Sequence, residues 1–303
     1  MDPADFAGAE DEPAFCRALR DAQVTIVGLG LMGGSLAAAL KAQNACRRVV
    51  GVARRTSTLQ MARSMRFIDR GTRDLREGLA EADLVILATP VRDILEKLAT
   101  IGDACKPGCV VLDIGSTKAR ICAAMERMPP HIQPIGGHPM CGKETSGITM
   151  AEPNLYRDRV FVLAPLERTS PRAQDLARQL VEVVGARPVY IEPERHDRLV
   201  AAISHLPYLL SVTCVSGAEA LAQDDDLVWR LAAGGFRDTS RVAAGSIPMM
   251  MDILLTNRGP VLEAIRHAQE RLAALDASLR AEEIEALEAQ LVAARNRRQE
   301  VFP

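Results

Sequence analysis

The sequence of 303 residues is 48% hydrophobic and 25% charged, a balance typical of a globular protein with an ordinary apolar core. A formal net charge of −2 and an aromatic content of 3% argue against nucleic-acid binding, because such surfaces are basic or rich in stacking rings. We expect no membrane-spanning helix, since no apolar run reaches about 18 residues, and no metal centre, since the 7 cysteines include no Cys-x-x-Cys pair.

The N-terminal segment 1–22 is acidic and has no apolar core, so it predicts a flexible extension and neither a secretion signal nor a transit peptide. Unpaired, scattered cysteines favour reduced thiols and hence a cytoplasmic protein. At about 150 residues per domain, the length predicts two domains.

Short β-branched and apolar runs alternate with helical stretches through the first two thirds of the chain. Runs that are apolar throughout suit strands buried on both faces, and intervening helices are what a doubly wound α/β sheet requires. We therefore predict a Rossmann-type domain at 23–193. Its predicted strands cover 24–28, 48–53, 83–90, 109–115, 133–137, 159–165 and 187–193.

Beyond Pro193 the strand pattern stops and helical patterns follow, which predicts an all-helical domain at 194–303. Pro207 lies inside the first helical stretch and predicts a kink there. The predicted helices cover 194–222, a short stretch near Leu227, 249–257, 260–279 and 282–299.

A glycine-rich turn joins the first predicted strand to the helix after it. Gly28, Gly30 and Gly33 have the spacing G-x-G-x-x-G. This spacing gives a tight turn, close approach of the backbone to a pyrophosphate, and a helix N-terminus that binds phosphate. The turn, with Leu31 and Met32, therefore predicts a dinucleotide site; the alternative is a tight turn without a ligand.

The end of the second predicted strand favours NADP over NAD. NAD-binding domains usually place an acidic residue there to hold the ribose 2′-hydroxyl, and this chain has Ala53 instead. Arg54, Arg55 and Ser57 follow and suit a 2′-phosphate, because guanidinium groups match phosphate geometry. The alternative is a solvated basic turn in which Thr56 or Ser57 caps the next helix.

Polar residues also follow the next two predicted strands, at the sheet edge where ligands bind in open α/β folds. Thr89 and Pro90 end the third strand, and we expect them beside the cofactor. Ser116 and Thr117 follow the fourth. Ser116 is expected either to face the nicotinamide end and a substrate hydroxyl or to cap the following helix, and Thr117 is expected to cap it.

His138 is the strongest candidate for a catalytic group. It lies in "IGGHPMCGKETSG", where glycine and proline exclude a regular helix, and we predict a loop that follows the fifth strand to the same edge. A histidine of ordinary pKa, about 6.5, changes its charge near neutral pH. We therefore expect a reaction rate that rises with pH through neutrality.

Two segments of the helical half carry further candidates. His205 lies before Pro207 in an apolar helical pattern, where a lone histidine is more often a hydrogen-bonded core residue. "GGFRDTSR" then interrupts the helices with glycines and charges. A polar turn of this kind, with Gly234, Asp238 and Arg241, is a candidate binding loop.

Taken in order, these motifs resemble the prephenate/arogenate dehydrogenase family of tyrosine biosynthesis. The resemblance rests on "GLGLMGGS", "ATP", "DIGSTK", "GGHPMCGKETSG", "HD" at 196–197, "SHLP" and "GGFRDTSR". The strand end "GVARRTST" is most similar to that of the NADP-linked, arogenate-using members.

The resemblance implies an oxidative decarboxylation that turns a cyclohexadienol carboxylate into an aromatic product. His138 would accept the proton of the ring hydroxyl, Ser116 would hydrogen-bond to that hydroxyl, and Arg241 would bind the ring carboxylate. Arogenate would give tyrosine, and prephenate, the alternative substrate, would give 4-hydroxyphenylpyruvate.

The resemblance also implies ion pairs from Glu144 and Asp238 around Arg241, with Gly234 in the same substrate-binding turn. His205 would line the pocket near the substrate side chain. A homodimer through the helical domain is implied as well, with the active site between the two domains and no partner beyond substrate and cofactor.

Two other functions remain as alternatives. A β-hydroxyacid dehydrogenase shares the glycine-rich opening, but its catalytic lysine is absent, since no lysine follows Lys143. A non-catalytic NADP-binding protein would not need Ser116, His138 and Arg241. One departure from the resemblance concerns substrate choice: Met250 stands where some prephenate-using members have tryptophan, which favours arogenate.

Overall fold

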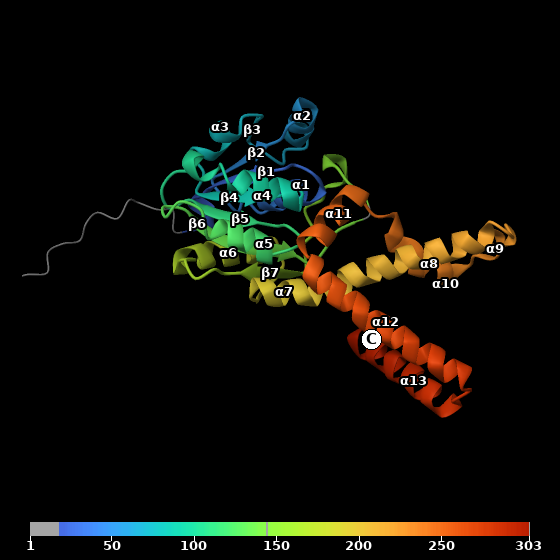
Figure 1. Cartoon of the computed structure of the whole chain (residues 1–303). Coiled ribbons are helices and arrows are strands. Elements are labelled where there is room, and N and C mark those ends of the chain that lie inside the picture. Colours follow the sequence, from blue (N-terminus) through green and yellow to red (C-terminus); the bar gives the residue numbers. More distant parts are fainter. Residues whose placement is uncertain (1–17, 144, 303) are drawn as a thin grey trace, which may run out of the picture.

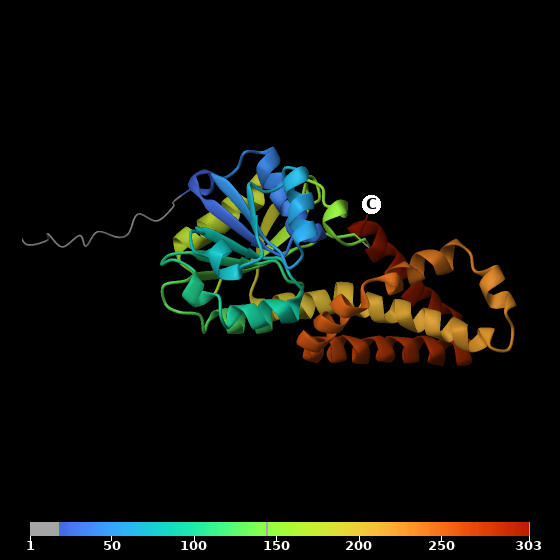
Figure 2. The same ribbon diagram turned by 90° about the horizontal axis from the view of Figure 1, so that it is seen from above.

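The computed structural model describes residues 18–143 and 145–302 of the chain (Figure 1). Most of the predicted extension therefore lies outside the described residues, as does Glu144. The described chain forms a sheet flanked by helices, from which further helices extend as two arms (Figures 1 and 2).

The predicted Rossmann-type fold is confirmed by one sheet of 8 strands in the order β3-β2-β1-β4-β5-β6-β7-β8. All neighbouring strands are parallel except β6 and β7. The three-residue strand β3 is too short to have been predicted. The strands are β1 Gln23–Val27, β2 Arg48–Val52, β3 Arg70–Thr72, β4 Leu84–Leu87, β5 Val110–Asp113, β6 Gln133–Pro139, β7 Val160–Ala164 and β8 Arg187–Tyr190.

Helices cover both faces of this sheet because successive strand residues point to opposite faces and are apolar on each. Ile26 and Ile86 belong to one buried cluster, whereas Val27 and Leu87 belong to the other. Helices α1 Leu31–Ala42, α2 Thr56–Ser64 and α6 Pro171–Val183 contribute to the first cluster, and α3 Leu75–Leu79, α4 Val91–Leu98 and α5 Ala119–Met125 to the second.

After β8 every regular element in the described chain is helical. The helix that begins this region runs unbroken over Pro193–Ala222 as α7 Pro193–Val200, the π-helix η4 Ala201–His205 and α8 Leu206–Ala222. The predicted kink at Pro207 is thus a π-helical turn, which accommodates the missing N–H of the proline. The remaining elements are α9 Leu227–Leu231, α10 Gly234–Ser240, η5 Arg241–Ala244, α11 Ile247–Thr256, α12 Arg258–Arg280 and α13 Ile284–Val301.

The helical region joins the sheet domain through α7 and α11. The Arg92 backbone nitrogen of α4 donates to Asp252 of α11 at 3.2 Å, and the Thr117 and Thr256 hydroxyls lie 2.9 Å apart across the same junction. These contacts place α11 beside the ends of β4 and β5.

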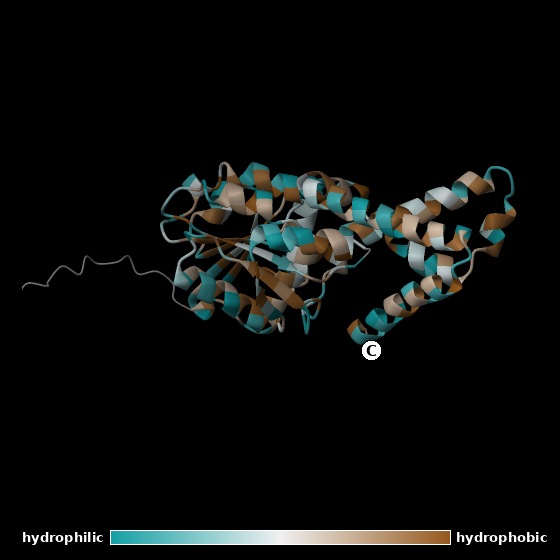
Figure 3. Cartoon of the chain, turned by 60° about the horizontal axis from the view of Figure 1, so that its bottom comes forward, coloured by the Kyte–Doolittle hydropathy of each residue, from teal (hydrophilic) through white to brown (hydrophobic). Residues whose placement is uncertain are grey.

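The long helix Pro193–Ala222 is largely unburied in the single chain. Its most apolar 18-residue stretch has a mean hydropathy of 1.6, yet only 22% of that stretch is buried. By length and composition this one helix meets the requirement for crossing a membrane, which differs from the expectation drawn from the sequence. Apolar segments are visible along the extended arms in Figure 3.

Candidate active site

The glycine-rich turn between β1 and α1 has the shape that a dinucleotide requires. Gly28 has a φ of +101°, and a Cβ there would lie 2.7 Å from the Ala88 oxygen. A Cβ on Gly33 would lie 2.0 Å from the Gly28 oxygen, whereas one on Gly30 would meet no described atom within 4 Å. No side chain caps α1 at Gly30. The backbone is thus tight below the turn and open at the helix N-terminus, which fits a pyrophosphate.

This turn is supported by the segment that follows β6. The Tyr156 hydroxyl, fully buried, donates to the Met32 oxygen at 2.6 Å, and the Glu152 backbone nitrogen donates to the Ser35 hydroxyl at 3.0 Å. The Thr89 methyl group also packs under the turn, because a Cβ on Gly28 would lie 2.7 Å from it. The cofactor turn and the chain beyond His138 therefore pack as one unit.

Exposed arginines gather where β2 and β3 end. Arg54 and Arg55 follow β2, and no side chain caps α2, so the alternative of Thr56 or Ser57 as the cap is not observed. Arg73, which sequence reasoning missed, follows β3 and donates through Nε to the Arg54 oxygen at 3.0 Å. Its position depends on a strand that the sequence pattern does not predict.

The predicted capping role of Thr117 is wrong. Helix α5 is capped by Asp197 of α7, whose Oδ1 accepts from the Lys118 nitrogen at 2.7 Å and whose Oδ2 accepts from the Ala119 nitrogen at 2.9 Å. The Thr117 hydroxyl is instead engaged with Thr256. Ser116 remains partly exposed in the loop just before this cap.

Beneath this loop lies a buried ion pair between Lys118 and Asp113. The Asp113 carboxylate also accepts from the Gly115 nitrogen at 2.8 Å and from the Gly137 nitrogen at 3.2 Å. Asp113 therefore links the Ser116 loop to the strand that carries His138.

His138 lies in strand β6 and not in the predicted loop. The strand continues to Pro139 because it pairs antiparallel with β7, with His138 opposite Val162. Glycine and proline excluded a helix but not a strand. Pro90 follows β4 and occupies the N-terminal cap position of α4.

His138 is the first member of a row of three hydrogen-bonded side chains. Its Nδ1 lies 2.8 Å from Nε2 of His196, and Nδ1 of His196 lies 2.8 Å from Oδ1 of Asp197. His196 and Asp197 are 1% and 2% exposed. The pair "HD" at 196–197 has no role that the sequence alone indicates, since its partners are distant in the chain.

Burial lowers the pKa of His138 well below its usual 6.5, and the nearby His196, Lys118 and His205 oppose its protonation further. The ring is therefore neutral at physiological pH. The expectation of a titration near neutrality is replaced by one at more acidic pH.

His205, at the end of η4, is buried with an exposure of 1%. The Asn257 amide nitrogen lies 3.1 Å from its Nδ1 and 2.8 Å from the Asp197 backbone oxygen. Burial lowers the pKa of His205 to about 4. His205 is thus a hydrogen-bonded core residue beside the row of three, and its contact with substrate stays a prediction.

The predicted polar turn with Gly234, Asp238 and Arg241 is helical, formed by α10 and η5. Glycine is tolerated there because it lies at the start of the helix. The Asp238 carboxylate accepts from Arg237 at 3.0 Å, and its predicted pairing with Arg241 stays a prediction. The Ala243 backbone nitrogen of η5 donates to the Ser211 hydroxyl of α8 at 3.1 Å. The role of Glu144 lies outside the described residues.

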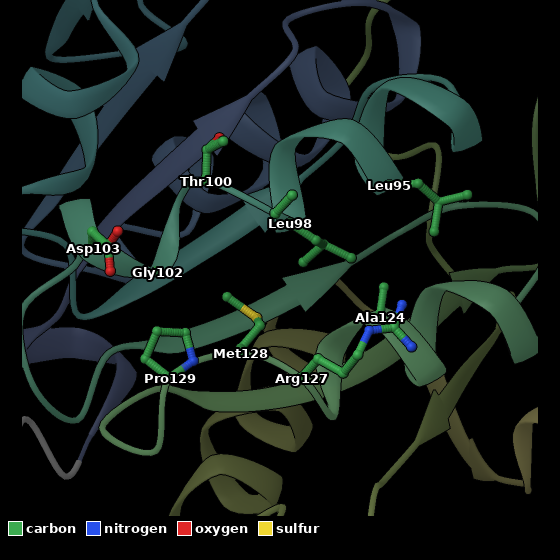
Figure 4. Close-up of a pocket in the computed structure, with 10 residues that line it drawn as sticks. Leu95, Leu98, Thr100, Gly102, Asp103, Ala124, Arg127, Met128 and Pro129 are labelled. Carbon is green, nitrogen blue, oxygen red and sulfur yellow. The ribbon is translucent and has the colours of Figure 1, made fainter.

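A cavity of about 160 Å³ between α4 and α5 is lined by Leu98, Thr100, Met128 and Pro129 among others (Figure 4). Its lining follows the C-terminal ends of both helices, at the opposite edge of the sheet from the glycine turn. It therefore takes no part in the candidate site.

Comparisons with known proteins indicate the same family over most of the chain. Residues 36–190 match the family described as prephenate dehydrogenase, nucleotide-binding domain, and residues 192–293 match prephenate dehydrogenase, dimerization domain. A prephenate dehydrogenase of Bacillus subtilis (strain 168) is 34% identical over 244 residues, which are 79% of this chain and 65% of that protein. The chain thus spans slightly less than two thirds of that relative.

Two solved structures resemble the whole described fold. Prephenate dehydrogenase from A. aeolicus, in complex with hydroxyphenyl propionate and NAD+, has a TM-score of 0.87 and 29% identity, covering 93% of this chain and 99% of that one. Arogenate dehydrogenase from Synechocystis has a TM-score of 0.81 and 30% identity, covering 92% and 100%.

Proposed function

Because the chain belongs to the prephenate dehydrogenase family, we propose that it catalyses the NADP-dependent oxidative decarboxylation of arogenate to tyrosine. The alternative substrate is prephenate, with 4-hydroxyphenylpyruvate as the product. The observation that carries the proposal is the row His138–His196–Asp197, which lies at the same sheet edge as the glycine turn.

Relatives of both substrate types support the reaction class. The Bacillus protein is named for prephenate and the Synechocystis protein for arogenate. The A. aeolicus structure holds hydroxyphenyl propionate, a phenol with a carboxylate side chain, together with NAD+. A phenolic ligand beside a nicotinamide cofactor is what a reaction that forms a para-substituted phenol requires.

The preference for NADP rests on the residues at the ends of β2 and β3. Ala53 offers no carboxylate for a ribose hydroxyl, and Arg54, Arg55 and Arg73 gather around that position. Guanidinium groups bind phosphate in pairs of hydrogen bonds, so this cluster suits a 2′-phosphate. Gly28, Gly30 and Gly33 would hold the pyrophosphate in either cofactor.

The site divides the chemistry among its residues. When bound, the nicotinamide supplies the acceptor for the hydride that leaves the ring carbon. His138 takes the proton from the hydroxyl on that carbon, and Ser116 hydrogen-bonds to the same oxygen. Arg241 holds the ring carboxylate until it leaves as CO2. A neutral, half-buried imidazole suits this role because it accepts a proton without first releasing one.

A homodimer in the cytoplasm is the proposed form of the protein. The helical region matches a dimerization domain, and its long helix leaves most of its apolar stretch uncovered. A second copy would bury that stretch, and we therefore favour dimerisation over membrane insertion. We also propose that the substrate binds where 23–193 meets 194–303, since α7 brings His196 and Asp197 to the sheet edge.

Formation of NADPH, followed by absorbance, tests this proposal. The purified chain is assayed with arogenate and with prephenate, each in the presence of NADP or NAD. We expect the highest kcat/KM for arogenate with NADP, and tyrosine in amounts equal to NADPH. Equal or higher kcat/KM with NAD contradicts the cofactor assignment, and reaction with prephenate alone contradicts the substrate.

A further inference from the structure

The positions of the hydrogen atoms in the row His138–His196–Asp197 can be derived from a contact between Asp197 and a residue outside the row. Oδ1 of Asp197 accepts from the backbone N–H of Lys118 at 2.7 Å, and a backbone nitrogen can only donate. The same oxygen lies 2.8 Å from Nδ1 of His196. Nδ1 of His196 therefore carries hydrogen and donates to the carboxylate.

The next step along the row fixes His138. A neutral His196 with hydrogen on Nδ1 has a lone pair on Nε2. Nδ1 of His138 lies 2.8 Å from that atom and must donate to it. The lone pair of His138 is then on Nε2, the only ring nitrogen left to accept a proton from a substrate.

We propose that His196 and Asp197 form a proton relay behind His138, so that the proton removed from the substrate hydroxyl comes to rest on His196. The inference rests on the proposed function, in which His138 is the base. His196 and Asp197 are then positioning residues, since they act on the substrate through His138.

The relay conserves protons at each step. The hydroxyl proton bonds to Nε2 of His138 while Nδ1 of His138 gives its own proton to Nε2 of His196. His138 is left neutral, and His196 becomes an imidazolium that donates from Nδ1 to the Asp197 carboxylate. When CO2 leaves, the product oxygen is a phenolate. The relay then reverses and returns the proton to that oxygen, so that no proton is released overall.

The surroundings explain why the charge would rest on the second histidine. Burial and the nearby His196, Lys118 and His205 lower the pKa of His138, so a positive charge there is costly. The groups that face His138 are His196, His205 and the Lys118–Asp113 pair. His196 has a carboxylate in direct contact, and an opposite charge at this distance stabilises the imidazolium. The relay thus lets a half-buried ring of low pKa act as a base.

Nitrogen NMR of the full chain labelled with ¹⁵N-histidine tests the proton positions without turnover. We expect His138 to carry hydrogen on Nδ1 and none on Nε2. In Asp197→Ala the acceptor for Nδ1 of His196 is removed, so His196 is free to reverse, and the His138 signals should shift toward hydrogen on Nε2. Unchanged His138 signals in a folded Asp197→Ala protein would overturn the relay.

A second pair of variants leaves the cap on α5 intact. In His196→Gln the amide oxygen can still accept from His138, but it cannot hold a proton. We expect kcat to fall by roughly 10- to 100-fold with little change in KM, and to fall further in His196→Leu, toward the roughly 10⁴-fold loss seen when a catalytic histidine is in the wrong tautomer. Normal kcat in His196→Gln would overturn the proposal.

A matched control separates capping from the relay. Asp74 caps α3 by accepting from the Glu77 nitrogen at 3.2 Å, far along the chain from the site. Asp74→Ala should leave both kcat and the histidine signals unchanged. Failure of the proposed function gives a different result, since His138→Asn would then keep a normal kcat while the tautomer shift in Asp197→Ala would still appear.

Discussion

The Asp197 carboxylate lies 2.7 Å from the Lys118 backbone nitrogen, so a residue of the helical region caps a helix of the sheet domain. An aspartate at such a position supplies about 0.5–2 kcal/mol of helix stability. The same oxygen lies 2.8 Å from His196. The helical region therefore orders the Ser116 loop and the histidine row with a single side chain.

The cofactor preference should respond to Arg73. Arg73→Ala removes one cation from the cluster at the ends of β2 and β3, and an exposed charge-assisted contact of about 1.5 kcal/mol corresponds to roughly a 10-fold rise in KM for NADP. KM for NAD should stay the same, because NAD lacks the 2′-phosphate. Arg76→Ala, at an exposed position on α3, is the control. Equal effects of Arg73→Ala on both cofactors would refute the assignment.

The role of His138 predicts a loss of turnover without a loss of binding. His138→Asn should lower kcat by roughly 10²- to 10⁴-fold with little change in KM. In the unaltered enzyme kcat should be flat through neutral pH and should fall only in acid, because burial lowers the pKa of His138 below 6.5. A pH–rate profile tests both points. A rate that rises through pH 7 would show that another group titrates.

Arg241 is predicted to bind the ring carboxylate. Arg241→Ala should raise the KM for substrate by roughly 10- to 150-fold, the equivalent of about 1.5–3 kcal/mol. Arg241→Lys should recover part of this loss, because an ammonium lacks the guanidinium fork. NADP binding, measured by titration, should barely change. Weakened NADP binding with a normal substrate KM would place Arg241 outside the substrate pocket.

The buried histidines predict a loss of stability in acid. An unfolded histidine takes up a proton below about pH 6.5, whereas burial lowers the pKa of folded His205 to about 4. The unfolded state binds more protons in this window, so the free energy of unfolding falls as the pH drops from 6.5 toward 4. Urea unfolding at several pH values measures this slope. His205→Asn should reduce the slope, and His267→Gln, at an exposed position, should not.

The Thr117–Thr256 contact predicts energetic coupling between the two regions. The hydroxyls lie 2.9 Å apart and Thr256 also donates to the Asp252 oxygen at 2.7 Å, so Thr117 is the donor in the pair. Thr256→Val leaves the buried Thr117 hydroxyl without an acceptor and should cost about 1–3 kcal/mol. The double change to valine should cost less than the sum of the single changes. Strict additivity in denaturant unfolding would argue against the contact.

The sheet could be predicted from the sequence because its strands are apolar on both faces and glycine marks the first turn. The sequence predicts a loop at His138 because the strand there depends on pairing with β7, which residues 136–139 do not reveal by themselves. Strand β3 has three residues and no periodicity to detect. The π-turn before Pro207 reflects hydrogen-bond geometry that composition does not encode.

The candidate site is harder to predict from the sequence than the fold, because most of its contacts join residues that are distant in the chain. The glycine turn is local, so spacing alone predicted it. His196 and Asp197 contact partners 58 and 79 residues away, and only the folded chain brings them together. Arg73 likewise reaches the Arg54 oxygen across 19 residues. Residues whose role depends on such long-range contacts form no motif that can be recognised in a single sequence.

The uncovered helix Pro193–Ala222 has a consequence for how the protein behaves on dilution. Only 22% of its most apolar stretch is buried within one chain. If a second copy supplies the missing cover, folding and association are linked by mass action, and the midpoint of unfolding depends on protein concentration. Each tenfold dilution then removes about 1.4 kcal/mol from the stability of the dimer relative to unfolded chains. A protein of this design is most vulnerable when it is scarce, as in the first minutes of its synthesis.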